Sequence, residues 1–325
     1  MLYKIFDAEA AKTLAFIGIF AGFLLTCLFL KVLKNILPRD GGRAFAVNGA
    51  LSQGKPRGAG IVFIIVFSIL AVLFVPFDTS NSLKEMLIYI LMIDAGMLSG
   101  YLDDSAKTPW GGLKKGLIDL AIALVCAVTY VNFNSTKVTF MITGTEFVFP
   151  AWLFIILAVI LIWGSINVTN CTDGVDGLSG STAIVTTITF YILFSQKLNN
   201  NSYSIFTLIM AACLLGYLWF NASPSRLLMG DAGSRAIGLF IAIIALKTGS
   251  PFFFLPAAAV FIIDGGLGLL KLSLLKFLKI KILKNTRTPI HDHVRKNCSW
   301  SDTQTVFRFV IIQTVISITA LFFVM

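Results

Sequence analysis

The chain has 325 residues, of which 57% are hydrophobic and only 13% are charged, a composition that excludes an ordinary soluble domain. Since one membrane span takes about 20 apolar residues, this length holds roughly ten spans with short connections and leaves no room for a large soluble domain. The net charge of +10 would suggest nucleic acid in a soluble protein, but basic inner loops account for it in a membrane protein, so no nucleic-acid partner is expected.

Apolar runs, broken by polar or Gly/Pro clusters, follow one another along the chain. They predict an all-α, polytopic integral membrane protein in which residues 1–325 form a single transmembrane domain. The expected helices cover residues 13–34, 58–76, 83–102, 115–133, 149–166, 177–195, 202–221, 236–248, 252–278 and 305–324. The eighth is short, and Gly249 and Pro251 separate it from the ninth.

Basic residues divide unevenly between the two ends of these helices. All but six of the 26 Lys and Arg lie on the side of the loops that follow odd-numbered helices; the six are Lys4, Lys12, Lys84, Lys137, Lys197 and Lys247. The positive-inside rule predicts that the richer side faces the cytoplasm and that both termini lie outside. Aspartates gather on that same side: Asp103, Asp104, Asp173, Asp176, Asp231 and Asp292.

The third expected helix ends in the adjacent carboxylates Asp103 and Asp104, followed by Lys107. Two neighbouring anions at a membrane border are costly unless a cation or a proton-transfer role offsets their repulsion. The pair therefore indicates a divalent metal or acid/base work. Taken alone, a solvated helix end explains it equally well.

The fifth expected helix runs into a polar loop at 167–178 that contains Asn170, Asp173, Gly174 and Asp176. Its two Asp-Gly steps permit tight turns. Its Asn, Thr and Asp side chains supply donors and acceptors suited to a sugar, a base edge or an ion. The whole string favours a ligand site over a bland connecting loop.

Two more polar segments follow. Residues 229–234 read Met-Gly-Asp-Ala-Gly-Ser, and the glycines beside Asp231 allow a ligand to approach the backbone closely. Since Mg²⁺ prefers hard oxygen ligands together with substrate phosphates, Asp231 is the best candidate metal ligand. Residues 288–293 hold His291 and His293, the only histidines, which suit phosphate binding or proton relay unless they are incidental to a solvated loop.

Taken in order, the four segments resemble the polyprenyl-phosphate N-acetylhexosamine-1-phosphate transferase superfamily, over nearly the whole chain. The motifs are Asp-Asp-x-x-Lys, Asn-x-x-Asn-x-Thr-Asp-Gly-x-Asp-Gly, Met-Gly-Asp-x-Gly-Ser and Thr-Pro-Ile-His. The last of these, with Trp-Phe-Asn-Ala at 219–222, is most similar to the bacterial phospho-N-acetylmuramoyl-pentapeptide transferase family.

The resemblance implies a transferase of peptidoglycan synthesis in the bacterial cytoplasmic membrane, with active-site loops that face the cytoplasm. It implies UDP-MurNAc-pentapeptide as donor, undecaprenyl phosphate as acceptor, Mg²⁺ as cofactor, and lipid I and UMP as products. It also implies ten transmembrane helices in contact with membrane lipid, and a homodimer.

The family's site residues carry over by position. Asp103 and Asp104 match its aspartate pair, Asp231 its metal-binding aspartate, and Lys107 and Lys115 its basic positions. Asn170 and Asp173 match positions near the reacting phosphates and sugar, and Gly174, Asp176 and Asn221 match the nucleoside pocket. We expect Lys107, Lys115 and His291 to hold phosphate oxygens, His293 to bind substrate, Asp103 to take a proton from the acceptor, and Asp104 to orient metal or lysine. Direct in-line attack is expected rather than a covalent aspartyl intermediate.

The chain departs from the family pattern at several positions. The usual three histidines read His291-Asp292-His293, Leu228 stands where an aromatic residue usually stacks on uracil, and Ser52 stands where lysine is expected. The early Gly-Thr-Pro-Thr-Met-Gly-Gly segment reads Gly-Lys-Pro-Arg-Gly-Ala-Gly at 54–60. These departures leave a UDP-GlcNAc donor open as an alternative.

A secondary transporter is the alternative from another class, because Asp94, Asp119 and Asp264 fall within apolar stretches. That class also calls for internal repeats with interrupted helices, which the sequence does not show. The ninth helix is expected to form a wall of the groove for the polyprenyl tail. A bend at 264–266 is predicted there, with ordinary packing of the glycine pair as the alternative.

Overall fold

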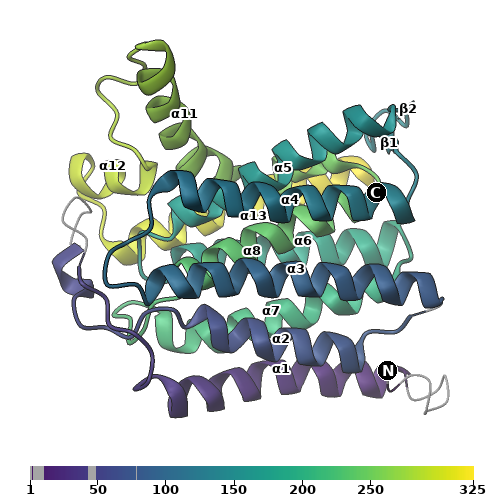
Figure 1. Cartoon of the computed structure of the whole chain (residues 1–325), viewed down its shortest axis with the longest axis horizontal. Helices are drawn as coiled ribbons and strands as arrows, with labels where there is room; N and C mark the ends of the chain where they lie inside the picture. Colours follow the sequence, from purple (N-terminus) through teal and green to yellow (C-terminus); the bar gives the residue numbers. More distant parts are fainter. Residues whose placement is uncertain (1, 3–10, 43–48, 78) are drawn as a thin grey trace.

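A computed structural model describes residues 2, 11–42, 49–77 and 79–325. Helices dominate it and run side by side along one axis (Figure 1). The start of α1 and the end of α13 lie at the same end of this bundle. The opposite end carries η3, the end of α3 and the short helix α12.

The first half of the chain contains α1 (Ala11–Leu33), η3 (Gly49–Ser52), α2 (Gly60–Phe74), α3 (Ser80–Asp104), α4 (Gly112–Phe133), β1 (Lys137–Thr139), β2 (Glu146–Val148) and α5 (Ala151–Thr172). Next come α6 (Leu178–Ile192), η4 (Leu193–Lys197), α7 (Asn201–Asn221) and α8 (Gly230–Lys247). The last part contains η5 (Pro251–Phe253), α9 (Phe254–Ala257), α10 (Ala259–Phe261), η6 (Ile262–Gly266), α11 (Leu267–Ser273), η7 (Leu274–Leu278), α12 (Ile290–Asn297) and α13 (Asp302–Val324).

Within the described residues, seven helices are long and apolar enough to cross a membrane, or eight if the bent segment from Pro251 to Leu278 counts as one span. The chain is therefore a polytopic membrane protein. Each of the ten predicted apolar runs coincides with a helical segment, but α2 has only 15 residues and α8 carries charged side chains. The count of ten spans and the outside location of the termini stay predictions.

The central element is α8, which is buried almost all round. A helix that is apolar on every face belongs in a protein interior, and α8 packs along both α3 and α5. Contact with α5 is close: the Ser165 hydroxyl donates to the Gly238 carbonyl at 2.6 Å. A Cβ on Gly238 would lie 2.6 Å from the Ser165 carbonyl oxygen, so a larger residue does not fit there.

Two predictions of the fold need correction. The all-α prediction missed a hairpin in which β1 and β2 pair antiparallel, with Lys137 opposite Val148. The ninth helical segment bends by 75°, but at Ala258, whose φ of −122° and ψ of 26° are not helical, rather than at 264–266. Those residues form a π-helical turn, and Gly265 packs directly on the Val168 carbonyl of α5. The glycine thus serves packing, the alternative considered from the sequence.

The start of α3 and the end of α8 are joined by a buried ion pair. The Lys247 ammonium lies 2.9 Å from the Glu85 carboxylate, and Asn134 at the end of α4 contacts both side chains. Only about a tenth of the Lys247 side chain is exposed. Antiparallel α3 and α8 are therefore fixed at this end by charge.

Replacing Lys247 by Met should destabilise the protein by about 3 kcal/mol, because it leaves Glu85 buried without its counter-charge. The Glu85→Gln/Lys247→Met double variant should regain part of the loss, measured as thermal unfolding in detergent. Lys137→Met is the control, since it removes an ion pair to Glu146 in which both side chains are about half exposed. Its effect should stay below about 1 kcal/mol. Equal losses for the two Met variants would contradict a buried, stabilising pair.

Candidate active site

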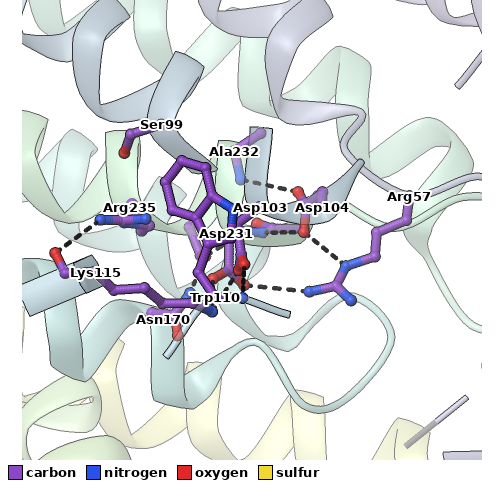
Figure 2. Close-up of polar contacts among 12 residues, drawn as sticks. Arg57, Ser99, Asp103, Asp104, Trp110, Lys115, Asn170, Asp231, Ala232 and Arg235 are labelled. Atoms are coloured by element: carbon purple, nitrogen blue, oxygen red, sulfur yellow. Dashed lines mark hydrogen bonds and ion pairs between the residues drawn. The ribbon is translucent and has the colours of Figure 1, made fainter. Parts of the chain in front are cut away.

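Carboxylates from two helices that are far apart in the sequence meet at the end of the bundle that holds η3 and α12. Asp103 and Asp104 end α3, and Asp231 lies in the first turn of α8. Figure 2 shows Lys115, from the first turn of α4, and Arg57, from the loop before α2, approaching these carboxylates from opposite sides. The structure thus brings together the predicted aspartates and one of the two predicted lysines.

Asp104 fixes the start of α8. Its carboxylate accepts the backbone N–H groups of Asp231 and Ala232, both at 3.1 Å. The first N–H groups of a helix have no partner within the helix and carry partial positive charge, so a buried carboxylate is well placed there. Asp104 is therefore first of all the link that holds α3 against α8, a role that the sequence did not reveal.

Glycines allow this close contact. Gly230 has a φ of +69°, and a Cβ on it would lie 2.1 Å from the Asp104 carboxylate. A Cβ on Gly100, one turn earlier in α3, would lie 2.3 Å from the Asp231 carbonyl oxygen. The Met-Gly-Asp motif thus needs its glycine for backbone shape and for space.

Lys115 bridges Asp103 of α3 and Asp231 of α8. Its ammonium forms ion pairs with Asp103 and, at 3.0 Å, with Asp231. Asp103 also accepts the backbone N–H of Trp110. The Asn170 amide lies against Asp231 and donates to the Ser234 hydroxyl at 2.9 Å. Lys115 therefore offsets the repulsion between Asp103 and Asp231.

Arg57 is the site residue that the sequence noted only as a departure from the family pattern. Its Nε lies 2.7 Å from Asp104, and its two Nη atoms lie 3.3 Å from Asp231 and 3.5 Å from Asp40. Burial alone lowers the pKa of the guanidinium, but the carboxylates of Asp104, Asp231 and Asp40 outweigh it and hold the pKa above its usual value. No signal in a single sequence indicates which carboxylates this arginine meets.

The loop predicted to hold the nucleoside is tied to the segment before α8. The Asn221 carboxamide accepts the Gly177 N–H at 2.9 Å and donates to the Leu227 carbonyl at 2.8 Å, so this buried side chain joins the two loops. Asp176 accepts the backbone N–H of Ser225 at 2.9 Å and lies 3.3 Å from the Lys55 ammonium.

Ser52 stands where the family has a lysine, but a lysine ammonium is still present nearby, from Lys55. The Ser52 hydroxyl donates instead to Asp40, while Lys55, three residues later, places an ammonium beside Asp176. A cavity of about 280 Å³ opens next to Asp176 and is lined also by Gly177, Ser181, Ala222, Ser223 and residues of α13.

His291 is positioned by Asp264. Its Nδ1 lies 2.8 Å from one Asp264 oxygen, and its backbone N–H donates to the other at 2.7 Å. A Cβ on Gly174 would lie 2.2 Å from His291 Nε2, so the imidazole rests against the polar loop that follows α5. From the sequence, Asp264 was expected to be an intramembrane acid. Its pairing with His291, 27 residues away, was not predicted.

Two predicted residues lie outside these contacts. Lys107 is exposed and takes part in none of the ion pairs found among the described residues. His293 accepts the Arg287 backbone N–H at 3.3 Å within its own loop.

Asp173, which caps α5, contributes to the negative potential at Arg57.

The three intramembrane carboxylates each have a partner. Asp94 accepts the Ser68 hydroxyl at 2.7 Å, Asp119 pairs with Arg235 of α8, and Asp264 pairs with His291. These contacts give each acid a structural or positioning role. The acids within apolar stretches, which had favoured a transporter, are therefore explained without one.

The donor set at Asp231 fits a magnesium ion that also holds phosphates. No group of three or more metal-ligating side chains occurs among the described residues, but Mg²⁺ bound with substrate phosphates and waters needs only one or two carboxylates. Asp231 is the more exposed carboxylate of the cluster. Both of its oxygens are engaged here, one by Lys115 and the other by Arg57.

Comparison with known proteins decides the family. A model described as glycosyl transferase family 4 matches residues 85–249. The chain is 38% identical to the phospho-N-acetylmuramoyl-pentapeptide-transferase of Treponema pallidum (strain Nichols), over 93% of this chain and 87% of that protein. The chain belongs to this transferase family.

More distant relatives carry the same name. The Bacillus licheniformis protein is 31% identical over 90% of this chain and 92% of its own length. The protein of Wolbachia sp. subsp. Brugia malayi (strain TRS) is 28% identical over 91% and 94%. The predictions of a membrane transferase and of its family are thus confirmed over nearly the full length.

The close contact at Gly230 is open to test, because Gly249 provides a matched control. Both have positive φ, but a Cβ on Gly249 meets nothing within 4 Å. Gly249→Ala should cost about 1 kcal/mol of stability and keep its transferase activity. Gly230→Ala adds the clash with Asp104 and should lower turnover by roughly a hundredfold, since small misplacement of reacting groups has that effect. Similar activity of both purified variants would contradict the tight α3–α8 contact.

Proposed function

We propose that the chain transfers phospho-MurNAc-pentapeptide from UDP-MurNAc-pentapeptide to undecaprenyl phosphate, giving lipid I and UMP. The observation that carries this proposal is the Asp103–Lys115–Asp231 cluster, at one end of a helical membrane bundle, in a member of the transferase family. The reaction joins two anions, so the site must supply positive charge at the phosphates. The cluster combines such charge with carboxylates in one place.

Each side chain has a task in this scheme. Lys115 and Lys107 bind phosphate oxygens. The Lys115 ammonium already lies in the cluster, between Asp103 and Asp231. Asp103 takes any proton on the acceptor phosphate, and Asp104 keeps Asp231 in register through the backbone of α8. Asp231 is the residue that would hold Mg²⁺, which when bound supplies the charge that stabilises the leaving UMP.

The donor's nucleoside is assigned to the polar loop after α5. Asp176 lines a cavity there, and Gly174 leaves room for His291, whose ring Asp264 orients at Nδ1 and whose Nε2 faces the polar loop. Asn221 supports this loop rather than opening into solvent. Asn170, Asp173 and His293 complete the proposed substrate-binding set.

The acceptor's tail is assigned to the bent ninth segment. An apolar cavity of about 250 Å³ lies between α5 and the start of this segment, lined by residues that include Phe154, Leu157, Leu161, Phe252 and Leu255. Such a lining suits an isoprenoid chain. The proposal further places the site at the cytoplasmic face of a bacterial inner membrane, with ten spans, both termini outside, and two copies forming a homodimer.

The donor can be tested directly. Purified protein in detergent with undecaprenyl phosphate and Mg²⁺ should incorporate label into lipid from radiolabelled UDP-MurNAc-pentapeptide and not from UDP-GlcNAc. Label from UDP-GlcNAc alone would show that Leu228 and the His-Asp-His segment mark the other branch of the superfamily. Label from neither donor would contradict the proposed reaction.

The role of Asp231 can be tested with the isosteric Asp231→Asn variant. Turnover should fall by about a hundredfold or more, as it does when one charge-stabilising group is removed from other active sites. Added Mg²⁺ should not restore it. Glu146→Gln, on the hairpin at the far end, is the control and should keep full activity. Near-normal Mg²⁺-dependent turnover of Asp231→Asn would show that the metal ligand lies elsewhere.

A further inference from the structure

Arg57 occupies the centre of the acidic cluster, although no family motif quoted above contains an arginine at that position. Its guanidinium touches carboxylates from three separate segments: Asp40, Asp104 and Asp231. A guanidinium presents five donors in a planar fork that suits carboxylates and phosphates alike. About a quarter of this side chain is exposed, so a dissolved ligand can reach it.

The backbone around Arg57 is fixed to the start of α8. The Leu228 N–H donates to the Pro56 carbonyl at 2.8 Å, and the N–H groups of Ala59 and Gly60 donate to the carbonyls of Leu228 and Met229 at 3.0 and 3.1 Å. The Arg57 N–H itself donates to the Pro38 carbonyl at 2.8 Å. The arginine is therefore held next to Asp231 by the fold, and only its side chain is free to change partners.

Every carboxylate on Arg57 has another partner. Asp104 accepts two backbone N–H groups of α8, and Asp231 keeps Lys115. Asp40 accepts the Gly42 N–H at 3.2 Å and the Ser52 hydroxyl. Departure of the guanidinium therefore leaves no carboxylate without a donor, which lowers the cost of a change of partner.

The charges in the cluster favour such a change. Four carboxylates, Asp40, Asp103, Asp104 and Asp231, face two side-chain cations, Arg57 and Lys115. Lys115 and Arg57 each engage one oxygen of Asp231, so a dication that binds this carboxylate competes with both cations for it and repels them. The displaced guanidinium then lies beside the phosphates that arrive with the dication.

We propose that Arg57 is a phosphate-binding residue of this site, which in the substrate-free protein takes the place of the divalent cation at Asp231. This rests on the proposed function, because the phosphates are those of a nucleotide diphosphate donor. Arg57 thus competes with metal in the free protein and binds nucleotide phosphates in the loaded one. Two binding measurements without turnover separate these effects.

The first measurement is Mn²⁺ binding, followed by electron paramagnetic resonance on the full chain in detergent without nucleotide. Arg57→Met should bind Mn²⁺ about tenfold more tightly than the wild type, because a competing positive charge is gone. Arg57→Lys keeps the charge and should stay near the wild type. Arg39→Met is the matched control, since among the described residues the exposed Arg39 guanidinium is bonded to the Gly54 carbonyl and to no carboxylate.

The second measurement is UDP binding by calorimetry with Mg²⁺ present. Both Arg57→Met and Arg57→Lys should bind UDP about tenfold more weakly, because a lysine cannot supply the fork of two parallel donors. Arg39→Met should bind as the wild type does. The Arg57→Lys variant also guards against misfolding, because its Mn²⁺ affinity reports an intact site.

The outcomes separate the inference from the function on which it rests. Unchanged Mn²⁺ affinity in Arg57→Met, or unchanged UDP affinity in both variants, overturns the inference even if the wild type makes lipid product. A wild type that binds Mn²⁺ but not UDP overturns the proposed function, and the phosphate role of Arg57 with it. Tighter Mn²⁺ and weaker UDP in Arg57→Met, with Arg39→Met unchanged, support the inference.

Discussion

The site depends on one contact, in which the Asp104 carboxylate accepts the first backbone N–H groups of α8. A buried carboxylate is costly without donors, and the start of a helix offers donors that nothing inside the helix can use. The contact therefore satisfies both groups at once. It also brings the last residues of α3 within reach of Asp231, although 127 positions separate Asp104 from Asp231 in the chain.

The remaining charges are arranged around this contact. Lys115 joins Asp103 to Asp231, Arg57 joins Asp104 to Asp231, and both cations come from segments outside α3 and α8. At the opposite end, Glu85 and Lys247 hold the same two helices together. Antiparallel α3 and α8 thus carry a charged contact at each end.

Much of this was predictable because its signals are local. Apolar runs marked the ten long helical segments but not the short η3 and α12, and the Asp-Asp, Asp-Gly and Met-Gly-Asp motifs marked the loops that meet. Pairings between distant single residues were not predictable. Neither Asp264 with His291 nor Arg57 with Asp104 shows any pattern in the chain, since each depends on how helices pack. The bend at Ala258 has both kinds of cause: Pro256 lies two residues before it, and Gln313 of α13 bonds the Pro256 carbonyl and the Val260 N–H on its two sides.

The central claim is that Asp103, Asp104 and Asp231 border one pocket in which a divalent cation meets the phosphates of the substrate. The most direct test is an experimental structure with Mn²⁺ and UDP, in which the metal is located by its anomalous scattering. The account predicts one Mn²⁺ bound to an Asp231 oxygen and to UDP phosphate, with Asp103 and Lys115 beside it. A metal site remote from Asp231, or a UDP whose phosphates lie away from this cluster, would contradict it.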